Sequence, residues 1–321
     1  MRPAGRCGRN QTGGSIGGMI EVSDLTKRYG SVLAVDHLTF TVRPGRVTGF
    51  LGPNGAGKTT TLRMLLGLNS PTGGTATIGG RRFRDLGTGL RQAGALLDAG
   101  DVHNGRNARA HLSALARSNG LPGRRVAEVL RDVGLAEAAR RRIGGFSLGM
   151  KQRLGIATAL LGDPPVLLFD EPVNGLDPEG VRWARGLFRR LAAEGRTVFV
   201  SSHLMSEMEN TADHLIVIGQ GRLIADEPLS QFAARATRTT VTVRTPEPAV
   251  LAAALAGEGA SVQPDGPDVL IVSGMTADRV GEIAFDRQVL VREITAHAGG
   301  LEEAFVELTA DSVQYRAGES R

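Results

Sequence analysis

Between Met19 and about Glu227, short apolar runs alternate with segments whose apolar residues recur at helical spacing. The runs at 47–52, 165–171 and 196–203 are each typical of a strand, and 214–227 is typical of two strands joined by a turn at Gly219 to Gly221. The segment at 58–68 continues from the first of these strands as a helix. Alternating strands and helices predict a domain built on an α/β sheet.

The flanking segments differ in pattern from this alternation. Residues 90–161 are mostly helical and predict a helical insertion in the α/β domain, which we expect over 19–230. From about Arg235, strand-like and helix-like segments alternate again and predict a small α+β accessory domain over 236–310. The two ends, 1–18 and 311–321, are glycine-rich or polar. We expect a disordered or non-native arm at the first and a flexible tail at the second.

Composition favours a protein that does not cross a membrane by itself. Hydrophobic residues make up 41% of the chain, and its longest apolar runs are interrupted by Asp163, Pro164 and Asp170, well short of a bilayer span. Residues 1–18 lack the apolar stretch of a signal peptide. The single cysteine, Cys7, excludes an internal disulfide and favours a reducing compartment. We therefore expect the cytoplasm.

The net charge of +5 comes from arginines that cluster at 124–125 and 140–142. Such clusters could attract nucleic acid or an anionic membrane surface. Acidic residues are interleaved with them, and only 4% of the chain is aromatic, which leaves little for stacking against bases. Solvated helix faces are therefore the favoured interpretation, and we expect no nucleic-acid partner.

The stretch GPNGAGKT at 52–59 has the spacing of a phosphate-binding loop, and it lies between a predicted strand and a predicted helix. Glycines allow the backbone amides to turn toward a phosphate, and the helix N-terminus adds partial positive charge. Lys58 can reach the β and γ phosphate oxygens, and Thr59 can hold Mg²⁺. A glycine turn that carries a lysine by chance is the alternative, and the strand–loop–helix context argues against it.

Asp170 and Glu171 leave a buried strand at its carboxyl end, where ligands gather in open α/β sheets. Asp170 would reach Mg²⁺, and Glu171 could polarise an attacking water. An acidic pair in this position equally fits a helix cap, but the phosphate loop on the same chain favours catalysis. His203 ends the neighbouring strand within reach of a γ-phosphate. The other histidines fit structural roles: His37, His103, His111, His214 and His297.

Two predicted helix starts carry further candidates. FSLGMKQRL at 146–154 begins a helix with a capping serine, Ser147, followed by Gly149. Taken alone, this stretch fits an ordinary capped helix. Asp177 precedes a helix that begins with proline, an N-cap arrangement that also suits a contact between two ATP sites.

These elements, in this order, resemble the ATP-binding subunit of ABC transporters over about residues 20–230. The resemblance implies an α/β fold, with a P-loop NTPase core of ABC type, a helical subdomain at about 90–161 and a small α+β domain after the core. It implies ATP and Mg²⁺ as ligands, with Lys58, Glu171 and His203 as catalytic residues. Thr59, Asp98 and Asp170 are the implied metal ligands. The implied nucleotide-binding residues are Tyr29, which would stack on adenine, Gly52, Pro53, Asn54, Gly55, Ala56, Gly57, Lys58, Thr59, Thr60, Asp98, Ser147, Gly149 and Asp177.

Two positions depart from the family pattern. Asp98 stands where the family usually has a glutamine that binds Mg²⁺ and senses the membrane partner. A carboxylate can still ligate Mg²⁺, and its added negative charge would alter the rate and coupling of hydrolysis. FSLGM replaces the family's Leu-Ser-Gly-Gly-Gln, and Ser147 and Gly149 keep the two positions that face phosphate. We expect both departures to be compatible with function.

The resemblance also implies partners. Each ATP in this family is closed between two subunits, so one cassette per chain implies a homodimer or heterodimer, and transport requires a multi-span permease in a separate chain. The layout of cassette plus tail is similar to that of exporters of the antibiotic-resistance and ABC-2 type. We therefore expect a protein attached through its permease to the cytoplasmic face of the membrane. The alternatives are a soluble ABC-type ATPase that acts on DNA or ribosomes, and a regulatory module that does not hydrolyse ATP.

Overall fold

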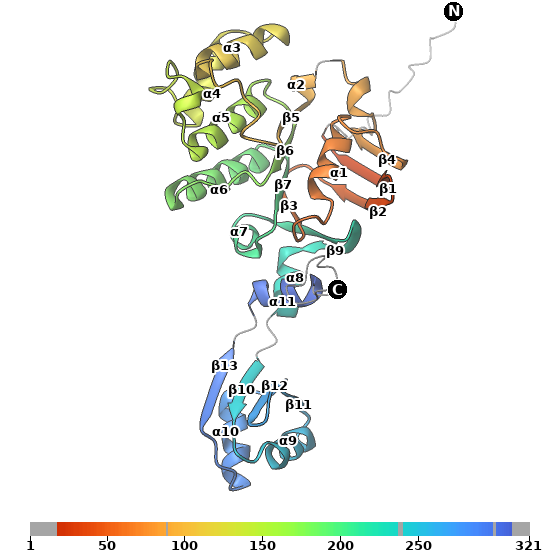
Figure 1. The fold of residues 1–321 in the computed structure, drawn as a ribbon, viewed down its shortest axis with the longest axis vertical. Coiled ribbons are helices and arrows are strands. Elements are labelled where there is room, and N and C mark those ends of the chain that lie inside the picture. The colour runs from red at the N-terminus through yellow and green to blue at the C-terminus, as the bar shows by residue number, and fades with distance from the viewer. Residues whose placement is uncertain (1–17, 88, 237–239, 298–299, 310–321) are drawn as a thin grey trace, which may run out of the picture.

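The computed structural model describes residues 18–87, 89–236, 240–297 and 300–309. Of the segments expected at the two ends, the arm at 1–18, apart from Gly18, and the tail at 311–321 lie outside the described residues. The described chain folds into a larger body that contains two sheets and a smaller body that contains one (Figure 1).

The larger body is built on a six-stranded sheet with the strand order β5-β6-β7-β3-β8-β9. Its strands are β5 (Ala93–Leu96), β6 (Val166–Asp170), β7 (Thr197–Ser202), β3 (Val47–Leu51), β8 (His214–Gly219) and β9 (Arg222–Pro228). The strands from β5 to β8 are parallel, and β9 returns antiparallel from the predicted turn. Every residue of β3, β6, β7 and β8 is buried, which explains why these strands are continuous apolar runs in the sequence. The predicted α/β sheet is confirmed.

Alternate residues of each central strand serve two different cores. Leu167 and Phe169 of β6 belong to one core, which extends into the helices on one side of the sheet. Val166 and Leu168 belong to the other, which includes α1 (Lys58–Leu65) and a second sheet. Because side chains pack on both faces of the central sheet, the positions of its strand ends are fixed.

The second sheet is antiparallel, with the order β2-β1-β4, and the pattern of the sequence did not distinguish it from the central sheet. Its strands are β1 (Ile20–Tyr29), β2 (Val32–Val42) and β4 (Gly73–Ile78). Phe40 of β2 joins the two sheets, because its ring centroid lies 5.6 Å from that of Phe50 and 5.9 Å from that of Phe199. This packing ties the strand before the phosphate loop to the outer sheet.

The predicted helical insertion is present and contains one strand of the central sheet, β5. Its helices pack on one another and on β5. They are α2 (Gly89–Gln92), α3 (Ala108–Ser118), α4 (Arg124–Asp132) and α5 (Leu148–Leu160), with a short 3-10 turn at Ile143–Gly145 and another before them at Phe83–Asp85. After β6 the chain continues through α6 (Pro178–Ala193), α7 (Met205–Glu209) and α8 (Leu229–Ala236).

The smaller body has its own core and a four-stranded antiparallel sheet with the order β11-β12-β10-β13. Two helices pack on one face of this sheet (Figure 1). The elements are β10 (Thr240–Arg244), α9 (Pro248–Gly257), β11 (Ser261–Pro264), β12 (Val269–Ser273), α10 (Ala277–Asp286) and β13 (Glu293–His297). The expected α+β accessory domain is thus present, with β11 as an additional strand.

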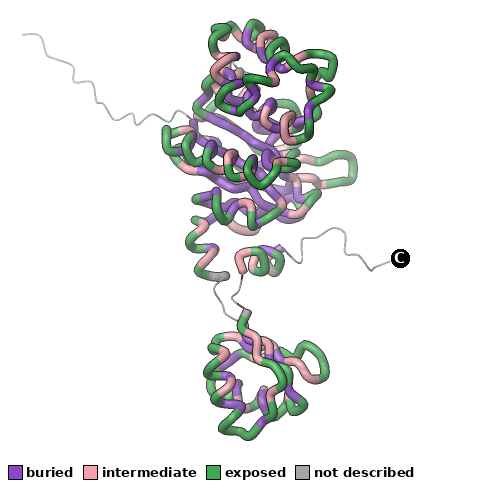
Figure 2. The backbone as a smooth tube through the Cα atoms, turned by 90° about the vertical axis from the view of Figure 1, so that its left-hand side faces the viewer, coloured by how far each residue is buried: buried purple, intermediate pink, exposed green. Residues whose placement is uncertain are grey.

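The last helix, α11 (Leu301–Thr309), differs from the expectation. It falls within the accessory domain expected over 236–310, but it packs against α7 and α8 of the larger body. Phe305 is buried in the same core as Phe232 of α8. The accessory domain, from β10 to β13, lies between α8 and α11 along the chain, and Figure 2 shows it at the lower end of the molecule. It is therefore an insertion between two helices of the larger body.

Candidate functional site

The predicted phosphate loop lies between the end of β3 at Leu51 and the start of α1 at Lys58. Gly57 caps the helix with φ of 101°, in the left-handed region that glycine adopts without strain. A Cβ atom at Gly57 would lie 2.5 Å from the carbonyl oxygen of Ala34, closer than any real contact. The tight entry into α1 therefore requires glycine, and it turns the first amides of the helix toward the loop.

Lys58 is buried inside the loop, with 6% of its surface exposed. Its Nζ donates hydrogen bonds to the carbonyl oxygens of Gly52 at 2.6 Å and Pro53 at 3.3 Å, and lies 3.6 Å from Oε1 of Glu171. Burial lowers the pKa of Lys58, while the charges of Glu171 and Asp170 oppose that shift. The ammonium is held by exchangeable oxygen partners, which phosphate oxygens can replace.

Thr59 and Asp170 form an oxygen pair at the start of α1. The Thr59 hydroxyl donates to Oδ2 of Asp170 at 2.6 Å, and the Ser201 hydroxyl donates to Oδ1. Hydroxyl and carboxylate oxygens are the ligands that Mg²⁺ takes in proteins, usually with waters and substrate phosphates in the remaining positions. Among the described residues no three His, Cys, Asp or Glu side chains gather as a metal cage. The donor set thus fits a magnesium ion that is shared with a nucleotide.

Glu171 is held from several sides in a backbone conformation with φ of 48°. Its amide donates to the Ser201 hydroxyl at 3.1 Å, and its carbonyl accepts from Nε2 of Gln152 at 3.3 Å. Its side-chain Oε2 lies 2.9 Å from Nδ1 of His203. A non-glycine residue in the left-handed region is uncommon, and surrounding contacts of this kind are what maintain it.

Gln152 and Ser201 are part of this site, although neither is among the site residues that the sequence predicts. Gln152 is buried in α5, and its Oε1 has no hydrogen-bond partner among the described residues. It lies on the helix that Ser147 caps, whose start was already a candidate, and that place in the sequence is the signal that could have pointed to it. Ser201 lies beside Asp170 in the pairing of β6 and β7.

Ser147, Gly149 and Asp177 form a separate group at the starts of two helices. Ser147 caps α5 by accepting from the amide of Met150 at 3.2 Å, and Asp177 caps α6 by accepting from Gly180 at 2.8 Å. A Cβ atom on Gly149 would lie 2.9 Å from the carbonyl oxygen of Gly175, so the two helix starts approach closely there. Both ends present amides that suit an anion.

Tyr29 and Asp98 have hydrogen-bond partners outside these two groups. Tyr29 ends β1 with 47% of its surface exposed, and its hydroxyl accepts a hydrogen bond from Nδ2 of Asn69 at 2.7 Å.

Asp98 is exposed two residues after β5, and its Oδ1 accepts a hydrogen bond from the amide of Gly100 at 2.7 Å. Since Leu96 of β5 pairs with Phe169 of β6, Asp98 follows the same sheet edge that carries Asp170.

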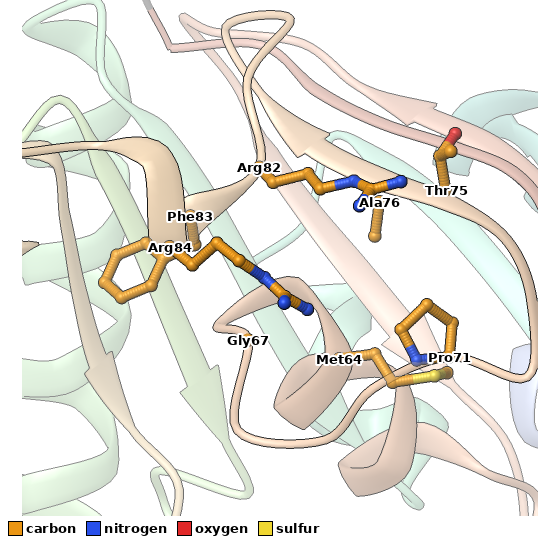
Figure 3. A pocket seen from close by; sticks show the side chains of 8 residues that line it. All are labelled: Met64, Gly67, Pro71, Thr75, Ala76, Arg82, Phe83 and Arg84. Atoms are coloured by element: carbon orange, nitrogen blue, oxygen red, sulfur yellow. The ribbon is translucent and has the colours of Figure 1, made fainter.

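A small hollow at the other end of α1 does not belong to this site. It is lined by Met64, Gly67, Pro71, Thr75, Ala76, Arg82, Phe83 and Arg84 (Figure 3). Met64 and Gly67 lie at the carboxyl end of the helix, where the backbone dipole is negative, whereas phosphate is favoured at the amino end. Of the two, the loop before α1 is therefore the better candidate for a phosphate site.

Comparison with known proteins agrees with this geometry. Residues 35–174 match the ABC transporter family. The bacitracin transport ATP-binding protein BcrA of Bacillus licheniformis is 45% identical over 220 residues, which are 68% of this chain and 72% of the relative. The chain belongs to the ATP-binding proteins of ABC transporters. As an ABC ATPase, it binds and hydrolyses ATP.

Two further comparisons extend this result. The Nod factor export ATP-binding protein I of Burkholderia orbicola is 38% identical to this ABC protein over 72% of the chain and 78% of the relative. The dimeric structure of a bacterial ABC transporter cassette, 24% identical, has the same fold with a TM-score of 0.61 over 65% of this chain and 98% of that one. Residues 239–302 match a domain of unknown function, DUF8746, which ends before Phe305.

Proposed function

We propose that this chain powers export through a separately encoded membrane permease, with drugs or antibiotics as the class of substrate. The observation that carries the proposal is the group of Lys58, Thr59, Asp170, Glu171 and His203, linked to one another by the contacts given above. The relatives support the direction and the class, since one is described as a bacitracin transport protein and the other as a Nod factor export protein.

In the proposed mechanism, Lys58 exchanges its loop carbonyl partners for the β and γ phosphate oxygens. Thr59 and Asp170 would hold Mg²⁺, which neutralises charge on the phosphates when it is bound. Glu171 orients the attacking water and accepts its proton, while His203, 2.9 Å from Glu171, keeps that carboxylate in place and meets the γ-phosphate. Tyr29 stacks on the adenine.

The second group completes the site from another subunit. ABC cassettes dimerise, and we propose that Ser147 and Gly149 of one copy meet the γ-phosphate bound in the loop of the other. Asp177 then lies at the contact between the two sites. The support is that Ser147 and Asp177 cap two neighbouring helix starts whose amides can bind an anion. Closure on ATP and reopening after hydrolysis would drive the permease.

We propose that the permease is another chain. Within the residues that the structure describes, every helix is too short or too polar to span a bilayer. We propose that the permease docks beside the Asp98 loop and the helices α3 and α4, which places the chain peripherally at the cytoplasmic face of the membrane. Asp98 would act here in place of the usual glutamine.

The substitution Glu171→Gln tests this function. We expect ATP hydrolysis to fall at least about 100-fold, the loss typical of a missing general base, while ATP binding is retained. Light scattering with size-exclusion chromatography should then detect an ATP-bound dimer. Lys58→Ala is the matched control, which should lose both nucleotide binding and the dimer. A Glu171→Gln protein that stays monomeric with ATP and Mg²⁺ would contradict the mechanism.

A second experiment tests the partner. A tagged full-length chain, isolated from detergent-solubilised membranes of its native host, should carry a multi-span membrane protein in a comparable amount. Recovery with ribosomes or nucleic acid, and without such a protein, would favour the alternative of a soluble ABC-type ATPase.

A further inference from the structure

Glu207 lies in α7, the short helix that follows His203 along the chain. Its carboxylate accepts a hydrogen bond from the hydroxyl of Ser202, the residue directly before His203. Ser202 is fully buried, and its hydroxyl also accepts from the amide of Leu204 at 3.0 Å, directly after His203. One buried hydroxyl thus joins both neighbours of His203 to the carboxylate of Glu207.

The surroundings of Glu207 indicate that this carboxylate does more than stabilise the fold. Burial raises the pKa of Glu207, and the hydrogen bond from Ser202 opposes that rise. Glu171 and His203 are close enough to act on it electrostatically, as is Arg185 of α6. A half-buried carboxyl beside a second carboxylate is costly to keep charged, and an apolar side chain would fill the same space at less cost.

We propose that Glu207 is a positioning residue for ATP hydrolysis, which holds the turn of His203 through Ser202. The inference rests on the role proposed above for His203. With the turn fixed, Nδ1 of His203 stays 2.9 Å from Oε2 of Glu171. Glu207 itself contacts Ser202 and the turn of α7, where its carbonyl oxygen accepts from the hydroxyl of Thr211 at 2.8 Å, and it acts through His203.

The test measures steady-state ATP hydrolysis by the full-length chain. Glu207→Ala should lower kcat about tenfold and leave KM for ATP within about twofold, because a displaced catalytic group slows the chemical step more than binding. Glu207→Gln keeps an oxygen that accepts from Ser202 and should restore kcat to within about threefold. Glu209→Ala, an exposed change at the end of the same helix, is the control and should leave kcat unchanged.

Two further variants identify the route of the effect. Ser202→Ala removes the same hydrogen bond by removing its donor, and it should lower kcat by a similar factor. This variant tests the inference even if the Glu207→Ala protein folds poorly. In a His203→Ala background, Glu207→Ala should cause no additional loss, since coupled residues give non-additive effects. An equal further loss in that background, or no rescue by Glu207→Gln, would overturn the inference. A His203→Ala enzyme with unchanged kcat would instead refute the role proposed for His203.

Discussion

Phe305 of α11 offers a direct test of how the chain is divided into domains. Its side chain is 6% exposed and lies in the core of the larger body, which is called the ATPase body from here on. Val306, its neighbour on the same helix, is 59% exposed. Phe305→Ala therefore removes a buried ring from the contact of α11 with α7 and α8, and Val306→Ala removes an exposed side chain of that helix.

The expected magnitude follows from this burial. Truncating a buried phenylalanine costs about 3–5 kcal/mol, and the lower value applies where a terminal helix can shift to fill the space. About 3 kcal/mol corresponds to a fall of about 6–12 °C in the Tm of a domain of this size. Val306→Ala should change the free energy of unfolding by less than about 0.5 kcal/mol.

Scanning calorimetry of the full-length protein is the assay, because two separate cores should give two transitions. We expect Phe305→Ala to lower the Tm of the ATPase transition and leave that of the accessory domain unchanged. Since α11 contacts α7, which begins two residues after His203, kcat should fall as well. Equal effects of Phe305→Ala and Val306→Ala, or a shift confined to the accessory transition, would refute the assignment of α11 to the ATPase body.

Three other predictions concern single sites. Gly57→Ala forces a side chain into a left-handed turn 2.5 Å from a backbone oxygen, and should weaken binding of a fluorescent ATP analogue at least about tenfold. Asp98→Ala should lower both the rate of ATP hydrolysis and the rate of transport. If both rates are unchanged, the role proposed for Asp98 is wrong. The hydrogen bond to Asp24 raises the pKa of His37, so its contribution to stability is full below about pH 6.5 and is lost as pH rises through the raised pKa. An NMR titration should show that raised pKa, and Asp24→Asn should lower the pKa of His37.

The phosphate loop and the acidic strand end could be predicted from sequence because their chemistry is local. The spacing from Gly52 to Thr59 fixes which amides and side chains face a phosphate, whatever packs around them. Asp170 and Glu171 follow a run of residues that is buried on both sides, so their place at a strand end is also visible in the sequence. The structure adds that Thr59 contacts Asp170, which joins the two motifs.

Contacts between distant segments could not be predicted in this way. The sequence of 301–309 clearly predicts a helix with an apolar face. The sequence does not show which core that face joins, and only the fold shows that the helix packs on α7 and α8. Gln152 and Ser201 join the site through α5 and β7, which the order of the sequence does not place beside Glu171. The same holds for Glu207, whose role depends on a bond to Ser202 across a turn.

The position of α11 gives the accessory domain a physical route to the site. The chain leaves the ATPase body after α8 and returns to it at α11, so the domain is tied at both ends to helices that share one core. A force on the accessory domain would act on α11, and α11 packs against α7, whose start lies beside His203 and whose Glu207 holds the turn of that histidine through Ser202. A domain joined by one flexible linker would lack this connection. The insertion therefore places the accessory domain, along the chain, directly before a helix that packs against α7, the helix that follows His203.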